Sequence, residues 1–163
     1  MSQCFLLTAF HVTLYCYTGE MEFIVYKGQK FIVEWYYDKN SKSNALEFFD
    51  SLTVDEQEDF LVLVKIMADR GKIFNKEKFR NEGDKIFAFK PKPNRFLCFF
   101  TVGKKIIVTN GFQKKQDKLP ANEKERAKSF RTDYLERTKK RGYYEKSDNF
   151  RKSNTKSEEK KEF

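Results

Sequence analysis

The sequence has few of the residues and motifs by which most enzyme classes are recognised. Its 163 residues include a single histidine, His11, and contain no GxSxG, HExxH or Walker-type phosphate-binding motif. Serine and cysteine hydrolases need a histidine base near the nucleophile, and His11 lies close to the N-terminus in a segment of different character. These hydrolase classes are therefore disfavoured.

Cysteine is also scarce. Cys4, Cys16 and Cys98 show no CxxC spacing and have no histidine neighbours, which argues against a zinc site and against a secreted disulfide scaffold. We therefore expect a cytoplasmic protein that needs no metal and no small-molecule cofactor. The apolar stretch from Cys4 to Tyr17 is too short for a full membrane span, and it lacks the flanks of a signal peptide, so no membrane association is expected.

Positive charge is abundant and unevenly distributed. The chain has 33 Lys and Arg against 24 Asp and Glu, a formal charge of +9. Residues 21–71 hold 6 basic and 10 acidic residues, whereas residues 72–128 hold 16 basic and 6 acidic ones. The second half therefore carries a basic surface that suits a polyanionic partner, although many of these charges would serve to solvate the surface.

The first part of the chain predicts a β-hairpin followed by two helices. Apolar residues alternate on both sides of the turn-prone Lys27-Gly28-Gln29, which is a hairpin pattern. Asn44 with Glu47 resembles a capping box for a helix over 45–52, and Thr53 with Glu56 forms a regular one for a longer helix that ends at Gly71. The two helices form a helical hairpin.

The second part predicts a three-stranded meander and a final helix. Residues 85–90, 95–102 and 104–110 are short runs rich in aromatic and β-branched residues, joined by a Pro-Lys-Pro-Asn turn and by Gly103. Pro120 suits the first turn of a helix that runs to about Arg141, with Gly142 as its terminator. The residues from Tyr143 onward have few core formers and are expected to be disordered, with exposed tyrosines.

Together these elements predict an α+β domain: a curved antiparallel sheet, made of an N-terminal hairpin and the meander, with a two-helix hairpin and a C-terminal helix. The expected folded unit is 21–141. It is preceded by an apolar extension over 1–20 of uncertain status, and followed by a charged tail over 142–163.

The reaction best suited to such a residue set is the cleavage of RNA by its own 2′-hydroxyl. The nucleophile then belongs to the substrate, and the protein needs to orient the backbone, stabilise charge on the phosphate and assist proton transfer. Lys90 ends one predicted strand, Arg95 begins the next, and Lys114-Lys115 follow the third. If the register brings these strand ends together, the cations would form a phosphate cradle.

The ordered set of motifs from Lys85 to Arg137 resembles the RelE/HigB-type toxins of the RelE/ParE superfamily, especially their phage-derived branch. The motifs comprise a strand-end basic residue, a following arginine, an aromatic run, a glycine turn, a Gly-Phe-x-Lys-Lys strand end, and a Pro-started helix with the pattern E-x-x-x-A-x-x-x-x-x-D-Y. Here they are Lys90, Arg95, Phe99-Phe100, Gly103, Gly111 to Lys115, Pro120, Glu123, Ala127 and Asp133-Tyr134. A weaker likeness extends back to about Met21.

The resemblance implies a RelE-like fold and a toxin of a type II toxin–antitoxin system. It implies a ribosome-dependent endoribonuclease (mRNA interferase) that cuts messenger RNA in the ribosomal A site and inhibits growth. It also implies neutralisation by a helix-turn-helix antitoxin. The sequence departs from the family pattern at Asn94, where an aromatic residue is usual, and at Lys90, where arginine is common, so different substrate contacts are expected. Relatives vary in which side chain acts as acid or base, and some use a histidine that this core lacks, so the proton-transfer group stays open.

Candidate site residues follow from both arguments. We expect the catalytic groups to be Arg95, as phosphate clamp, with Lys90, Lys114 and Lys115. We expect RNA contacts from Lys92, Arg80, Lys78 and Phe112, the last by stacking on a base. Each cation also fits a solvated surface position, and Phe112 equally fits the core.

Two other functions stay open at this stage. One is a non-enzymatic toxin or binder on the same fold, such as a gyrase inhibitor or a cleavage-dead relative. The other is a general nucleic-acid-binding module, which would explain the charge but not the ordered motifs. Non-enzymatic relatives on this fold lack the basic catalytic residues. The presence of Lys90, Arg95 and the Lys114-Lys115 pair therefore favours the nuclease.

Overall fold

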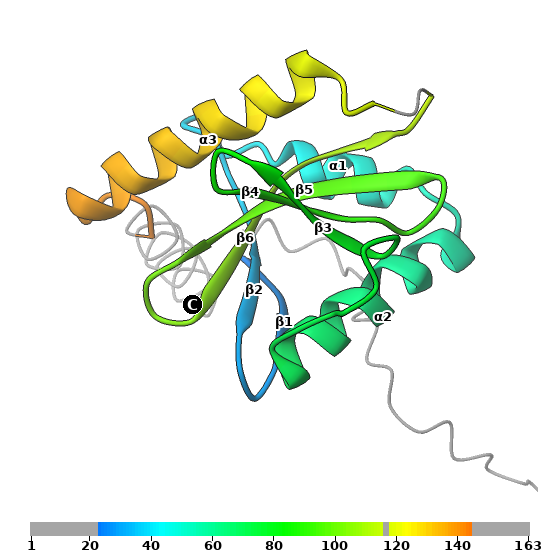
Figure 1. Cartoon of the computed structure of the whole chain (residues 1–163). Helices are drawn as coiled ribbons and strands as arrows, with labels where there is room; N and C mark the ends of the chain where they lie inside the picture. Colours follow the sequence, from blue (N-terminus) through cyan, green and yellow to red (C-terminus); the bar gives the residue numbers. More distant parts are fainter. Residues whose placement is uncertain (1–22, 116–117, 145–163) are drawn as a thin grey trace, which may run out of the picture.

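The structure is a computed structural model that describes residues 23–115 and 118–144. The elements are β1 (Ile24–Lys27), β2 (Ile32–Trp35), α1 (Asn44–Asp50), α2 (Val54–Arg70), β3 (Phe79–Gly83), β4 (Ile86–Phe89), β5 (Asn94–Thr101), β6 (Lys105–Gln113) and α3 (Ala121–Lys139). The strands form one curved sheet in the order β1-β2-β6-β5-β4-β3 (Figure 1). The predicted α+β class is confirmed.

The sheet differs from the prediction in two places. Strand β2 runs parallel to β6, with Ile32 opposite Lys105 and Trp35 opposite Val108, so the sheet is mixed and not wholly antiparallel. Strand β3 was not predicted because its sequence, FRNEG, is mostly polar and half-exposed. It pairs with β4 at the edge of the sheet, where polar side chains can face solvent, and extends the meander to four strands.

The helix boundaries follow the predicted signals closely. The capping box at Thr53 and Glu56 is present, and Gly71 ends α2 in the left-handed region with φ of 82°. The expected box at Asn44 is one residue out of place, because Ser43 is the N-cap of α1 and its hydroxyl accepts the Leu46 amide. Asn44 is the first residue of the helix.

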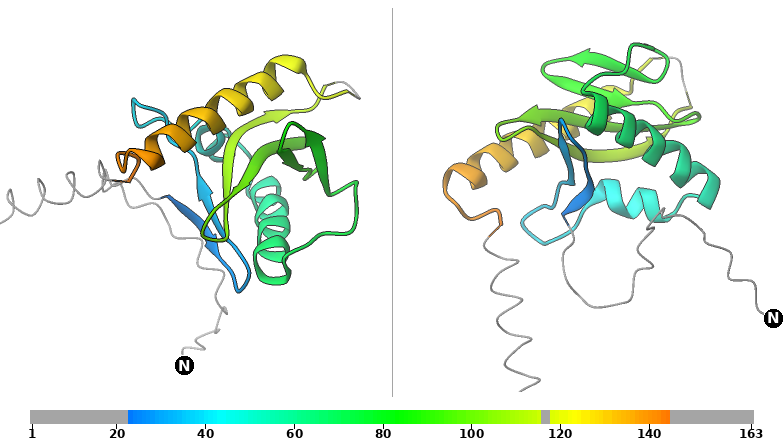
Figure 2. Two further views of the ribbon diagram at one scale, coloured as in Figure 1. Left: turned by 60° about the vertical axis from the view of Figure 1, so that its left-hand side comes forward. Right: turned by 90° about the horizontal axis from the view of Figure 1, so that it is seen from below.

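The helices cover both faces of the sheet (Figure 2). On one face, α1 and α2 pack on an aromatic core that includes Trp35, Phe60 and Phe96. The tip of the β1–β2 hairpin lies directly against α2, since a Cβ on Gly28 would stand 2.4 Å from the carbonyl carbon of Ala68. On the other face, α3 packs on Leu97 and Phe99 of β5.

The residues after α3 contradict the expectation of exposed tail tyrosines. The helix ends at Lys139, and Arg141, not Gly142, takes the positive φ of 56° after it. Tyr143 is 2% exposed, and its hydroxyl accepts a 2.8 Å hydrogen bond from the Tyr37 amide. Tyr144 donates to the buried Glu34 carboxylate at 2.6 Å. Both tyrosine hydroxyls have hydrogen-bond partners, so Tyr143 and Tyr144 can pack inside although the sequence around them is polar.

The predicted extension over 1–20 and the tail from 145 onward lie outside the described residues. Among the helices of the described part of the chain, none is both long enough and apolar enough to cross a membrane.

Candidate active site

The register of the sheet brings the predicted cations to one face. Arg95 of β5 lies opposite Phe112 of β6, and the β4–β5 pairing, in which Phe89 faces Phe96, continues to place Lys90 opposite Arg95. Directly opposed residues point to the same face of a sheet, and so do residues two apart along a strand. Because Leu97 of the same strand packs in the α3 core, these side chains lie on the α3 face.

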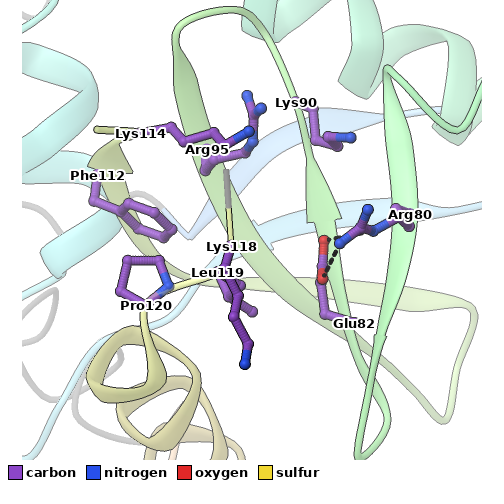
Figure 3. Close-up of a pocket in the computed structure, with 9 residues that line it drawn as sticks. All are labelled: Arg80, Glu82, Lys90, Arg95, Phe112, Lys114, Lys118, Leu119 and Pro120. Carbon is purple, nitrogen blue, oxygen red and sulfur yellow. Dashed lines mark hydrogen bonds and ion pairs between the residues drawn. The ribbon is translucent and has the colours of Figure 1, made fainter. Parts of the chain in front are cut away.

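A small pocket of about 30 Å³ lies where this face meets the segment leading into α3. Its volume suits about two water molecules, and therefore suits phosphate oxygens better than a nucleobase. Figure 3 shows its lining side chains, which come from β3, β4, β5, β6 and the segment before α3. They are Arg80, Glu82, Lys90, Arg95, Phe112, Lys114, Lys118, Leu119 and Pro120.

Lys90 and Arg95 are two buried cations in this pocket. Each is 7% exposed, and in the part of the chain that the structure describes neither makes an ion pair. Lys90 Nζ donates to the Lys76 carbonyl at 3.0 Å, and Arg95 donates to the carbonyl of Asn94 at 2.8 Å. Carbonyl oxygens only partly replace lost hydration, so both cations would gain from an anion.

Burial and mutual repulsion shift the titration of these groups. Burial lowers the pKa of Lys90 below its ordinary value, and the charge of Arg95 lowers it further. Burial also lowers the pKa of Arg95, although Glu82 and Glu77 act against this shift. Arginine nevertheless stays charged at any physiological pH, whereas Lys90 loses its proton more readily than an ordinary lysine. Lys90 is therefore the better proton-exchange group.

Among the described residues that line the pocket there is one carboxylate, and it is already engaged in an ion pair. Glu82 accepts two hydrogen bonds from the Arg80 guanidinium, at 3.2 and 3.0 Å, and its side chain is 8% exposed (Figure 3). The bidentate pair raises the pKa of Arg80 and fixes the orientation of its guanidinium. The described lining thus holds five cationic side chains and one carboxylate, which is an excess of positive charge.

One wall of the pocket is apolar. Phe112, Leu119 and Pro120 stand together there, at the end of β6 and just before α3 (Figure 3). Lys114 enters from the same segment, and its backbone amide donates to the Pro93 carbonyl at 3.0 Å. An anion site with an adjoining aromatic ring can hold a phosphate while stacking a neighbouring base.

Three predicted site residues lie outside this pocket. Lys92 is on the β4–β5 turn, with a side chain 66% exposed and an ion pair of 3.6 Å with Glu77. Lys115 is exposed and does not line the pocket, and Lys78 lines a different groove, beside α2. Sequence patterns do not identify four further lining residues, Glu82, Lys118, Leu119 and Pro120. Pro120 could have been predicted as a site residue. It begins the helix that follows the Lys114-Lys115 pair, and the short connection keeps it close to that pair.

Other chemistries find little support among the described residues. No group of three or more His, Cys, Asp or Glu side chains is placed to hold a metal ion there. Cys98 is fully buried, and burial raises the pKa of its thiol, so it stays protonated and out of reach of a substrate. The cationic pocket is therefore the candidate active site.

Comparison with models of protein families gives a match. The model of the family described as "Phage derived protein Gp49-like (DUF891)" matches residues 47–131, just over half of the chain. That range contains every residue that lines the cationic pocket. No curated protein matches the sequence. The chain therefore belongs to the Gp49-like family of phage-derived proteins.

Proposed function

We propose that this protein is the toxin of a type II toxin–antitoxin pair and a metal-independent endoribonuclease that cuts messenger RNA on the ribosome, in the cytoplasm. The Gp49-like family is associated with toxin–antitoxin toxins of the RelE/HigB type, which implies an antitoxin partner. The observation that supports the nuclease proposal is the pair of buried cations, Lys90 and Arg95, which form no ion pair among the described residues and line one cationic pocket.

Arg95 is proposed as the phosphate clamp. Its fork of N–H donors matches two phosphate oxygens, and its burial removes competing water, so charge that develops on the phosphorane meets a preorganised donor. Arg80 adds a second guanidinium whose orientation is set by Glu82. Glu82 is thus a positioning residue.

Lys90 and Lys114 are proposed for proton transfer. Neutral Lys90 takes the proton of the 2′-hydroxyl, the 2′-oxygen attacks phosphorus, and the bond to the 5′-oxygen breaks as Lys114 protonates that oxygen. The products are a 2′,3′-cyclic phosphate and a 5′-hydroxyl end. The lowered pKa of Lys90 supports this role, because it increases the neutral fraction near neutral pH.

The apolar wall is proposed to hold the base next to the scissile phosphate. Phe112 is half-buried and lines the pocket, so its ring is placed to contact a base. Lys118 is exposed at the mouth and suits a backbone contact further along the strand. The predicted RNA contact of Lys92 outside the pocket remains part of this proposal. Lys115, predicted as a catalytic residue, is exposed outside the pocket and is proposed here only to contact the RNA backbone. Lys78, predicted to contact RNA, lines the groove beside α2 and has no role in this proposal.

Induction in a bacterial host tests the proposal. Wild type should arrest growth and create new messenger RNA 5′ ends within translated frames, and Arg95→Ala should do neither at equal protein level. Lys27→Ala, which removes one exposed cation from β1 at the other edge of the sheet, should behave as wild type. Arrest without new ends would reject the nuclease and favour a non-enzymatic toxin, such as one that acts on a topoisomerase.

A further inference from the structure

A second concave surface lies on the opposite side of the sheet from the cationic pocket. It runs between α2 and the segment that leads from α2 back to β3, and Figure 1 shows this segment returning alongside the helix. Its volume is about 440 Å³. The residues that line this α2 groove are Asp59, Val62, Leu63, Ile66, Arg70, Lys72, Ile73, Phe74, Asn75, Lys78 and Pro91.

The floor of the α2 groove is apolar and open to solvent. Phe74 is 81% exposed and Val62 is 46% exposed, and both are among the large hydrophobic residues that the described structure leaves uncovered. Leu63, on the same helix, is buried and continues the apolar surface into the core. Single exposed apolar residues are common, but two lining one groove that reaches the core indicate a binding surface.

The rim of the α2 groove is positively charged. Arg70, Lys72 and Lys78 line it together with one carboxylate, Asp59. Among the described residues none of the three cations forms an ion pair, and the Lys72 ammonium lies 4.5 Å from the centre of the Phe74 ring. The groove thus offers an apolar floor bordered by three cations that form no ion pair within the described part of the chain.

The shape of the groove favours a helical occupant. Its α2 residues extend from Asp59 to Arg70, which at 1.5 Å per residue is about 17 Å, or roughly three helical turns. The backbone hydrogen bonds of α2 are internal to the helix, so the α2 side of the groove provides side chains and no open ladder for a strand. An amphipathic helix of about three turns fits this length, and it binds through side chains without needing backbone hydrogen bonds from α2.

We propose that the α2 groove binds an amphipathic helix of a partner protein, whose apolar stripe is flanked by aspartate and glutamate. The apolar stripe would cover Phe74 and Val62, and its carboxylates would pair with Arg70, Lys72 and Lys78. This surface is separate from the cationic pocket, so the helix can bind without occupying the proposed active site. The proposal does not depend on nuclease activity.

The test uses the full chain and three synthetic 18-residue peptides. The first is an alanine-based helix with leucines at alternating spacings of three and four residues and glutamates beside them. The second has the same composition with the leucines scrambled, and the third has lysine in place of glutamate. Binding is measured by fluorescence anisotropy at physiological salt, and the first peptide alone is expected to bind.

Variants assign the binding to the groove. Phe74→Ser should weaken binding of the first peptide at least about tenfold, because the ring contributes most of the exposed apolar surface. Lys72→Glu should weaken it as well, and Arg95→Ala, in the other pocket, should leave it unchanged. Phe74 is so exposed that its replacement should leave the melting temperature within a degree or so of wild type, which provides the folding control.

Four results would overturn the proposal. The first is equal binding of the scrambled peptide, and the second is binding that is unchanged in Phe74→Ser. The third is a dimer in solution that Phe74→Ser dissociates, since the groove would then belong to a second copy of this chain. The fourth is displacement of the first peptide from Arg95→Ala by a 20-nucleotide single-stranded RNA, which would assign the groove to nucleic acid.

Discussion

Lys90 and Arg95 face each other across the turn between β4 and β5, each 7% exposed, and among the described residues neither has a carboxylate partner. Two like charges that are both dehydrated destabilise the fold in the absence of a ligand. A bound anion would offset the repulsion and the lost hydration of the two cations. The pair that destabilises the free protein therefore favours phosphate binding.

Inorganic phosphate should therefore stabilise the protein. At concentrations well above its dissociation constant, we expect about 1–3 kcal/mol of stabilisation and a melting temperature higher by several degrees. Sodium chloride of equal ionic strength should have a much smaller effect. In the Lys90→Ala/Arg95→Ala double variant the phosphate effect should disappear, and an undiminished shift there would show that phosphate binds elsewhere.

The pH dependence of cleavage should report on Lys90. Its lowered pKa means that the neutral base forms at a lower pH than in an ordinary lysine, so kcat/KM should rise with pH through that pKa. Lys90→Arg keeps the charge but cannot lose its proton, so the rising limb should vanish together with most of the rate. A variant that retains the wild-type profile would remove Lys90 from proton transfer.

Glu82→Gln should change both substrate affinity and the pH profile. The glutamine cannot hold Arg80 by a bidentate ion pair, so KM should rise by about tenfold. Glu82 also raises the pKa of Lys90, hence its neutralisation should move the rising limb to lower pH. Asp84→Asn is the matched control, because it makes the same charge change at an ion pair with Lys124, outside the pocket.

Tyr143→Phe should lower stability by about 1–3 kcal/mol, because the buried Tyr37 amide would lose its acceptor. Tyr143→Ala should cost more, about 3–5 kcal/mol, because it also leaves a cavity among Tyr36, Tyr134 and Phe23. Chemical denaturation measures both changes. Unchanged midpoints would contradict the packed position of Tyr143 and restore the expectation of an exposed tail.

Local patterns predicted those parts of the fold that depend on nearby residues. The alternation around Gly28, the Thr53–Glu56 box and the helix end at Gly71 each arise from interactions within a few residues. The parallel pairing of β2 with β6 joins residues about seventy positions apart, and no local pattern records it. The burial of Tyr143 likewise depends on the distant Tyr37 amide.

The sequence predicted those residues of the candidate site that lie at the ends of the predicted strands. Lys90, Arg95, Phe112 and Lys114 come together because antiparallel pairing places consecutive strand ends side by side. Lys78 lies in the turn before β3, where the alternation of faces along a strand does not apply, and it lines the α2 groove and not the cationic pocket. Glu82 could not be predicted as a site residue, because the sequence of β3, FRNEG, lacks the alternating apolar residues that indicate a strand.

The most direct test of the proposed nuclease is cleavage of a defined message on purified translating ribosomes, with chemical identification of the new ends. We expect fragments with 5′-hydroxyl and 2′,3′-cyclic phosphate ends for wild type and for Lys27→Ala, and none for Arg95→Ala. Intact message with wild type, 5′-phosphate ends, or equal cleavage by Arg95→Ala would contradict it.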